Sequence, residues 1–243
     1  MGPAFSRKPV NLQTKTEWGT PQIKRGTHMK RLLTLLFAVG ISFSTWAQKQ
    51  LSANDVAKLE TEIEAQASKI NTIKSQFKQV KHVNGMSKDL NSNGDMMYKK
   101  DNKVILNYTT PIKYQMVLNG TKVKMVNGGK SKVYDTNAAG ASTNEMQKMI
   151  SSCMTGDMKA LKKDYKLLYF EQGQNYLVKI VPNANKKLFK EIEMEMQKSD
   201  KMLLRLRLVE NPKAGKKGED YTEYQFSNTQ KNVNLQDNLF AIE

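Results

Sequence analysis

Residues 192–197 read Ile-Glu-Met-Glu-Met-Gln, and residues 204–208 read Leu-Arg-Leu-Arg-Leu, in a chain of 243 residues. In both segments apolar and polar residues alternate strictly. Successive side chains of a β-strand point to opposite faces of a sheet, so each segment would have one apolar face and one charged face. The alternation predicts two strands whose charged face meets water and whose apolar face must be covered.

Segments of the same kind recur along most of the chain. They predict strands at 72–82, 94–100, 103–109, 112–118, 122–125, 130–135, 165–171, 175–181, 190–197, 202–209 and 220–227. Connections are short, and Asn119-Gly120 is typical of a two-residue hairpin turn. About ten or eleven short strands joined this way predict an antiparallel meander, which at this size curls into a barrel or a partial barrel.

Two segments have helical spacing instead. Residues 52–69 carry apolar residues along one stripe, and Ser52 can cap the start of the helix. A shorter helix is predicted at 143–154. Two helices are too few to cover the whole apolar face as a flat layer, so we expect them to lie across the open mouth of the curled sheet as a lid. The predicted fold class is therefore mainly β (α+β).

The N-terminal region has the features of a secretory signal peptide. Arg31 precedes the apolar run 32–43, and Thr45-Trp46-Ala47 supplies the small residue expected at a cleavage site. A run of this length cannot span a bilayer, which needs about 20 apolar residues. We therefore expect cleavage after Ala47 and an exported protein, either periplasmic or extracellular.

The predicted signal peptide also sets the domain organisation. A signal that starts at Met29 makes residues 29–47 the signal peptide and residues 1–28 an upstream leader outside the mature protein. No linker or repeat divides the remainder, so residues 48–243 are predicted to form a single domain.

Charge and composition bear on the class of function. The formal net charge of the chain is +16, and removing the seven basic residues and one acidic residue of 1–47 leaves +10. The lysines do not gather with aromatic residues on one face, which argues against a nucleic-acid partner. Cys153 is the only cysteine and His82 is the only histidine after residue 47, so a histidine zinc cluster is excluded.

Enzymatic chemistry is poorly supported by the remaining residues. No Gly-x-Ser-x-Gly motif is present, and a Cys153–His82 dyad would need a thiol from an amphipathic helix, where a small apolar residue is the simpler interpretation. We expect no catalytic residues, no metal and no cofactor.

Binding of an apolar ligand fits the pattern better. The inward register is rich in methionine, whose flexible and polarizable side chain suits irregular apolar partners. A barrel mouth lined by such residues is a usual site for a hydrophobic ligand. The predicted acyl site comprises Phe77, Met96, Tyr98, Leu106, Tyr108, Tyr114, Met116, Leu118, Met125, Ile192, Met194, Met196, Leu204 and Leu206, covered by Met146, Met149, Ile150 and Met154.

Five short motifs follow one another in a recognisable order. They are Phe77-Lys78-Gln79, Gly94–Lys100 (Gly-Asp-Met-Met-Tyr-Lys-Lys), Tyr108–Pro111 (Tyr-Thr-Thr-Pro), Leu118–Lys122 (Leu-Asn-Gly-Thr-Lys) and Val133–Asp135 (Val-Tyr-Asp). Together with the signal peptide, this order resembles the periplasmic outer-membrane lipoprotein carrier family, the LolA-like proteins, over roughly residues 51–243. The family's Lys-Arg-Pro segment is replaced here by Lys-Lys-Asp, which indicates a divergent member.

The resemblance implies an incompletely closed antiparallel β-barrel with a helical lid. It implies a monomeric, non-enzymatic chaperone that accepts the acyl chains of lipoproteins from an inner-membrane ABC exporter and delivers them to an outer-membrane acceptor. At the position of a family arginine linked to lid closure this chain has Lys100, the implied lid contact. An alternative is a carrier-like half-barrel that acts as a periplasmic lipid sensor or as a shuttle for another lipid.

Overall fold

The computed structural model describes residues 48–135, 149, 151–183, 189–212 and 218–242. All of them fall within one compact unit, Ser44–Glu243. The predicted leader and signal peptide lie outside the described residues, as do Met146 and Ile150 of the predicted cover. Within the described ranges, no helix combines the length and the apolar character needed to cross a membrane.

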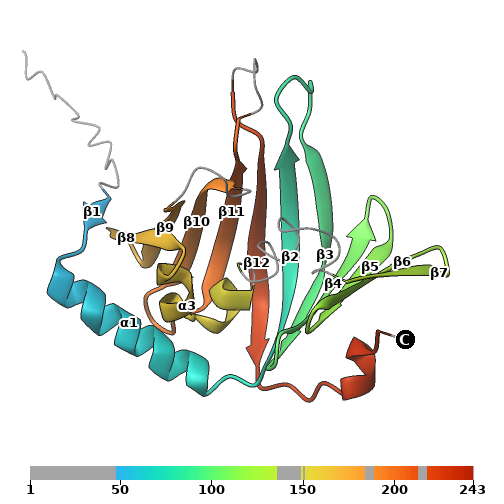
Figure 1. The fold of residues 1–243 in the computed structure, drawn as a ribbon, viewed down its shortest axis with the longest axis horizontal. Helices are drawn as coiled ribbons and strands as arrows, with labels where there is room; N and C mark the ends of the chain where they lie inside the picture. Colours follow the sequence, from blue (N-terminus) through green and yellow to red (C-terminus); the bar gives the residue numbers. More distant parts are fainter. Residues whose placement is uncertain (1–47, 136–148, 150, 184–188, 213–217, 243) are drawn as a thin grey trace, which may run out of the picture. The chain divides into compact units, whose positions relative to one another are not determined.

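Twelve strands of the described chain form one antiparallel sheet (Figure 1). Their bounds are β1 Lys49–Gln50, β2 Thr72–His82, β3 Leu90–Lys99, β4 Lys103–Thr110, β5 Tyr114–Asn119, β6 Lys122–Asn127, β7 Lys130–Asp135, β8 Tyr165–Gln172, β9 Asn175–Pro182, β10 Phe189–Gln197, β11 Leu203–Glu210 and β12 Tyr221–Lys231. The order across the sheet is β1-β8-β9-β10-β11-β12-β2-β3-β4-β5-β6-β7.

The sheet is curved but not closed. Its two outermost strands, β1 and β7, do not pair with each other, so the barrel is incomplete, as the sequence predicts. The eleven predicted strands are all present, and the twelfth is the two-residue β1, which pairs with β8. The strand pair most distant in the sequence is β12 with β2, which pair from Tyr221 opposite His82 to Lys231 opposite Ile73.

Helices pack against the concave face of this sheet. Helix α1, Ala53–Ser68, begins as predicted, because the Ser52 side chain accepts a hydrogen bond from the Asp55 backbone N–H. The predicted helix 143–154 is described only at residues 149 and 151–155, which are helical. A further helix, α3, spans Met158–Lys162 and lies against β8; at five residues it is too short to be recognised from apolar spacing.

The alternation of β10 and β11 sets the register of the sheet. Met194 lies opposite Leu206 and Glu195 opposite Arg205, so the apolar side chains share the concave face. Leu206 is only 1% exposed, a degree of burial that stabilises the fold by about 1.5–3 kcal/mol. On the convex face, the Arg205 guanidinium donates to Glu195 at 2.9 Å and to Glu193 at 3.0 Å.

The register shifts at the start of β11, and one sequence expectation is wrong there. A bulge places Leu203 opposite Met196, so Leu203 is buried in the concave cluster and Leu204 is only half-buried outside it. A bulge inserts one extra residue into one strand, which reverses the faces on one side of it. Strict alternation read back from Leu208 therefore assigned Leu204 to the wrong face.

The C-terminal segment covers part of the convex face. Leu235 and Phe240 pack on Ile105 of β4 and Val117 of β5, and Phe240 is fully buried. The segment ends in the 3₁₀-helix η1, Asp237–Phe240. Lys103 Nζ reaches Asp237 at 2.8 Å, which ties this segment to the sheet. The alternation predicts that the charged, convex face meets water, but this segment covers part of that face with apolar residues.

Candidate functional site: the apolar concave face

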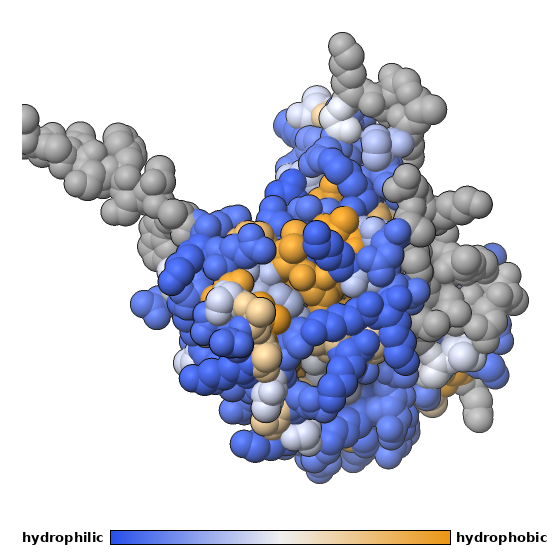
Figure 2. Space-filling model, turned by 60° about the vertical axis from the view of Figure 1, so that its left-hand side comes forward, coloured by the Kyte–Doolittle hydropathy of each residue, from blue (hydrophilic) through white to orange (hydrophobic). Residues whose placement is uncertain are grey.

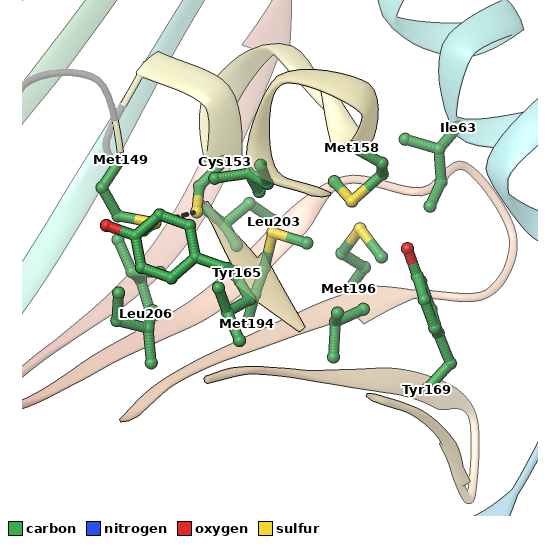
Figure 3. Close-up of a cluster of buried hydrophobic side chains, with 14 of the residues drawn as sticks. Ile63, Met149, Cys153, Met158, Tyr165, Tyr169, Met194, Met196, Leu203 and Leu206 are labelled. Atoms are coloured by element: carbon green, nitrogen blue, oxygen red, sulfur yellow. Dashed lines mark hydrogen bonds between the residues drawn. The ribbon is translucent and has the colours of Figure 1, made fainter. Parts of the chain in front are cut away.

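A large buried cluster joins the helices to strands β8–β11. It is built by Leu59 and Ile63 of α1, Met158 and Leu161 of α3, the helical residues Met149 and Cys153, and, from β8–β11, Tyr165, Tyr169, Val178, Ile180, Phe189, Ile192, Met194, Met196, Leu203, Leu206 and Leu208. We call it the first cluster. Figure 3 shows its centre, where methionine side chains of the helices and of β10 lie against one another.

The Cys153 thiol in this cluster has low reactivity. Cys153 Sγ lies 3.8 Å from Met149 Sδ, and burial raises the pKa of Cys153 to about 12. The thiol is therefore protonated near pH 7 and is a poor nucleophile. His82 lies elsewhere, where it contacts Asp89 at 2.7 Å and stacks on Tyr221, so the two residues form no dyad.

A second cluster covers the concave face of β2–β6. Its buried members are Ile73, Phe77, Met96, Tyr98, Val104, Leu106, Tyr108, Leu118, Val123 and Met202, with Tyr114, Met116 and Met125 packed against it and partly buried. Met154, Tyr224 and Phe226 pack against both clusters. The two clusters therefore form one apolar surface along the concave face.

A glycine shapes the middle of the second cluster. A Cβ atom on Gly94 would lie 2.2 Å from the Asn107 carbonyl oxygen and 2.7 Å from Phe77 Cζ. Distances under 3 Å exclude any side chain unless the strands move apart. The Phe77 ring therefore occupies the space over β3, and its centroid lies 5.0 Å from Tyr108 and 5.9 Å from Tyr224.

The space between the helices and the sheet comprises one small cavity and a wider, open groove of about 400 Å³ between α1 and β8. The enclosed cavity between α1, the helical residues 151–155 and the sheet has a volume of about 30 Å³. Ligand pockets typically measure about 300–1,000 Å³. Its wall is mixed, with Ile63, Met96 and Phe226 beside Ser75 and Thr229. In the described part of the chain, the space between α1, residues 151–155 and the sheet is thus filled mostly by side chains.

Hydrophobic residues also reach the surface. Figure 2 shows them gathered within a hydrophilic surround on one face of the molecule. Tyr114, Met116, Met125, Tyr224 and Phe226 are the partly exposed members of the concave surface near the second cluster. Apolar surface of this kind, rimmed by polar residues, is a common feature of binding sites.

Ion pairs hold α1 in place over the sheet. Glu60, Glu62 and Glu64 lie 2.6 Å from Lys162, 3.0 Å from Lys201 and 3.0 Å from Lys159, respectively. These pairs are at least partly exposed, and such pairs are each worth about 0–1 kcal/mol. The attachment of α1 therefore depends mainly on Leu59 and Ile63, with the ion pairs fixing its position.

Lys100 touches the same helix at its other end. Its Nζ donates to the Ser68 carbonyl oxygen at 3.1 Å, and its backbone N–H donates to the Asn71 carbonyl at 2.9 Å. A basic side chain at a helix C-terminus satisfies a carbonyl that lacks an intrahelical partner. The residue implied as a lid contact thus lies in contact with α1.

Most of the predicted inward residues belong to the two clusters. Ile192, Met194, Met196 and Leu206 belong to the first, with Met149; Phe77, Met96, Tyr98, Leu106, Tyr108, Tyr114, Met116, Leu118 and Met125 belong to the second or pack on it; Met154 packs on both. Leu204 belongs to neither. Tyr224 and Phe226 were missed, although their two-residue spacing in the predicted strand 220–227 was a signal for one shared face.

No metal centre is evident in the described residues. Their histidine, cysteine and carboxylate side chains form no group of three that could hold an ion. The concave face instead offers mainly hydrocarbon, thioether and aromatic groups, which suit contact with an apolar ligand.

Comparison with known proteins gives a family match. The model of the family described as outer membrane lipoprotein carrier protein LolA matches residues 68–243. None of the curated protein sequences compared with the chain matches it.

Several solved structures have a similar arrangement of elements. A LolA superfamily protein from Nitrosomonas europaea has 12% identity and a TM-score of 0.41, over 75% of this chain and 97% of that one. The MucA/MucB complex of Pseudomonas aeruginosa has 12% identity and a TM-score of 0.45, over 78% of this chain and 61% of that one. Lipoprotein LppX of Mycobacterium tuberculosis has 8% identity and a TM-score of 0.40, over 76% of this chain and all of that one (100%).

Proposed function

The chain belongs to the LolA family, and from this premise we propose that it binds lipoprotein acyl chains on its concave face and carries them between membranes. The cargo would be received from an inner-membrane ABC exporter and passed to an outer-membrane acceptor. The protein would act in the periplasm as a monomer, after cleavage behind Ala47, with no catalytic step, cofactor or nucleic acid.

The observation that carries the proposal is the continuity of the apolar concave surface. Met154, Tyr224 and Phe226 each pack on both clusters, so one apolar surface extends from β8 to β6. Each acyl CH₂ group that moves from water to such a surface gains about 0.8 kcal/mol. Acyl chains can therefore bind without a dedicated polar contact for every carbon.

The small cavity determines how binding would proceed. A volume of about 30 Å³ cannot hold an acyl chain, so a chain that enters between α1, residues 151–155 and the sheet would move the helices away from the sheet. The contact between helices and sheet is rich in methionine, including Met149, Met158, Met194 and Met196. Methionine adapts to changing neighbours at low cost, which suits a face that binds either the helices or a ligand.

Substitution of the concave face tests the proposal directly. We expect Leu206→Glu to abolish binding of a palmitoylated lipopeptide, since a carboxylate would have to be buried beside the chains. Because Leu206 is 1% exposed and the variant can fail to fold, Phe226→Asp, at a partly exposed position, provides a second test. Leu239→Asp, at an apolar residue that is 45% exposed near the C-terminus, is the matched control. Undiminished affinity in folded Leu206→Glu and Phe226→Asp proteins would refute the site.

The identity of the natural lipid separates the proposal from its alternative. Mass spectrometry of protein purified from its own host would find lipoprotein peptides if the chain is a lipoprotein carrier. A bound free lipid, in the absence of such peptides, would instead support a shuttle or sensor for that lipid.

A further inference from the structure

Three tyrosines from separate strands meet within the apolar concave surface. They are Tyr108 of β4, Tyr114 of β5 and Tyr224 of β12. The rings of Tyr108 and Tyr114 stack with centroids 4.1 Å apart, because the two residues are directly paired across β4 and β5. Tyr224 and Tyr108 both lie edge-on to the Phe77 ring, with ring centroids 5.9 Å and 5.0 Å from it.

The hydroxyl groups of this set make weak contacts with one another, and Tyr108 faces both Tyr224 and Tyr114. The Tyr108 and Tyr224 hydroxyl oxygens are 3.3 Å apart, whereas O–H···O hydrogen bonds usually measure about 2.5–3.0 Å. The three hydroxyls carry three protons, and the contacts of Tyr108 with Tyr224 and Tyr114 use two of them, so one proton of the set is available to a further acceptor. A donor that lacks a good partner in an apolar environment is unfavourable, and a bound acceptor would relieve this cost.

The same hydroxyls remain neutral donors. Burial is the main cause that raises the pKa of Tyr108 well above its ordinary value, and the neighbouring tyrosines raise it further. Burial likewise raises the pKa of Tyr224. Both residues are therefore protonated throughout the physiological range and can donate a proton to a ligand oxygen.

The surroundings restrict the kind of acceptor. Phe77, Met96 and Leu106 are buried neighbours in the same cluster, and Gln79, which pairs with Tyr224 across β2 and β12, adds a neutral amide. An anionic group would lose its hydration there without gaining a counter-ion, which is costly. A neutral carbonyl oxygen at the end of a hydrocarbon chain meets both conditions, since the chain contacts the apolar residues and the oxygen accepts from the hydroxyls.

We propose that the Tyr108 and Tyr224 hydroxyls bind the carbonyl oxygen at the head of an acyl chain. The concave face would then distinguish acyl chains from plain alkyl chains and fix the position of the chain's polar end. Tyr114, partly exposed and stacked on Tyr108, would hold that ring in position. This inference rests on the proposed function, because it places a polar contact within the same acyl site.

The test compares two ligands that differ only in the carbonyl groups. One is a cysteine peptide bearing a glyceryl group with two ester-linked palmitoyl chains, and the other carries two ether-linked hexadecyl chains. The wild-type protein should bind the ester ligand about five- to tenfold more tightly, as expected for one or two net hydrogen bonds. The Tyr108→Phe/Tyr224→Phe double variant should bind both ligands equally, at the affinity of the wild-type protein for the ether.

Tyr221→Phe is the matched control, since its ring stacks on His82 away from the clusters. It should leave the preference for the ester unchanged. Equal binding of ester and ether by the wild-type protein, or an equal loss of both in the double variant, would overturn the inference while leaving acyl binding itself intact. Failure of the wild-type protein to bind either ligand would instead remove the proposed function.

A second pair of ligands identifies which carbonyl group is bound. A peptide with a single N-palmitoyl amide is compared with its N-hexadecyl amine counterpart. A preference for the amide that disappears in the double variant would assign the site to the amide-linked chain. A preference confined to the ester pair would assign it to the glyceryl chains.

Discussion

The two halves of the concave face differ in what covers them. Over β8–β11, six side chains from α1, α3 and the helical residues 149 and 151–155 close the first cluster: Leu59, Ile63, Met149, Cys153, Met158 and Leu161. Over β2–β6, Met154 is the only residue of the described helices that packs on the second cluster, and Tyr114, Met116 and Met125 stay partly exposed. The first half therefore acts mainly as the core of the fold, whereas the second half keeps more of its apolar side chains partly exposed.

The largest expected difference between the halves is in stability. Met194→Ala removes a fully buried side chain of the first cluster and should lower the free energy of unfolding by about 2–5 kcal/mol. Met116→Ala, at a partly exposed position of the second half, should cost about 1 kcal/mol or less. Urea denaturation of both variants measures the difference. Equal costs would mean that both halves are packed as core.

The stability of the second half should be sensitive to substitution of Gly94. Gly94→Ala places a methyl group 2.2 Å from the Asn107 carbonyl oxygen and against the Phe77 ring, so we expect a loss of about 1–3 kcal/mol in unfolding free energy. Asn93→Ala, an exposed change on the same strand, is the control and should cost under about 0.5 kcal/mol. A stable Gly94→Ala protein with unchanged near-ultraviolet circular dichroism would contradict the tight approach over β3.

The attachment of α1 should depend modestly on Lys100. Lys100→Ala removes the donor to the Ser68 carbonyl and should destabilise the end of α1 by about 0.5–1 kcal/mol. Limited proteolysis should then cleave faster near residues 66–71. Lys100→Arg keeps a donor of similar reach and should restore resistance. Identical cleavage of all three proteins would show that Lys100 does not hold the helix.

The smallest expected effect concerns the convex side of the second half. Hydrogen bonds and ion pairs from Lys103 and Lys99 hold the pKa of Asp237 below its ordinary value. A lowered folded-state pKa adds stability that is present above about pH 4 and is lost as pH falls through the folded value. Asp237→Asn should therefore be less stable than wild type at pH 7 and equal to it at the most acidic pH. A difference that persists unchanged in acid would exclude this linkage.

Much of the fold could be predicted from the sequence because alternation is a direct consequence of a sheet with one covered face. The strands at 72–82, 165–171 and 190–197 were located to within a residue or two. Helix α3 and strand β1 were missed because five and two residues are too few to show a period. The bulge at Leu203 could not be predicted, since it depends on pairing with β10 and not on local pattern.

The apolar cluster on the convex face, formed by Ile105, Val117, Leu235 and Phe240, is indicated in the sequence by a pattern other than alternation. Val104-Ile105-Leu106 is a run of three apolar residues, which indicates a strand buried on both faces. Its partner, Phe240, is more than 130 positions away in the chain, so only the tertiary structure brings them together. The extent of the cavity was likewise beyond the sequence, because the inward pattern is the same whether side chains fill the interior or line a hollow.

The central claim is that the helices leave the concave face when an acyl chain binds. Hydrogen exchange of the backbone amides, with and without a palmitoylated lipopeptide, measures this most directly. We expect faster exchange within α1, Ala53–Ser68, on binding, while β10 and β11 keep their protection. Binding that leaves the exchange of α1 unchanged, or slows it, would contradict the account.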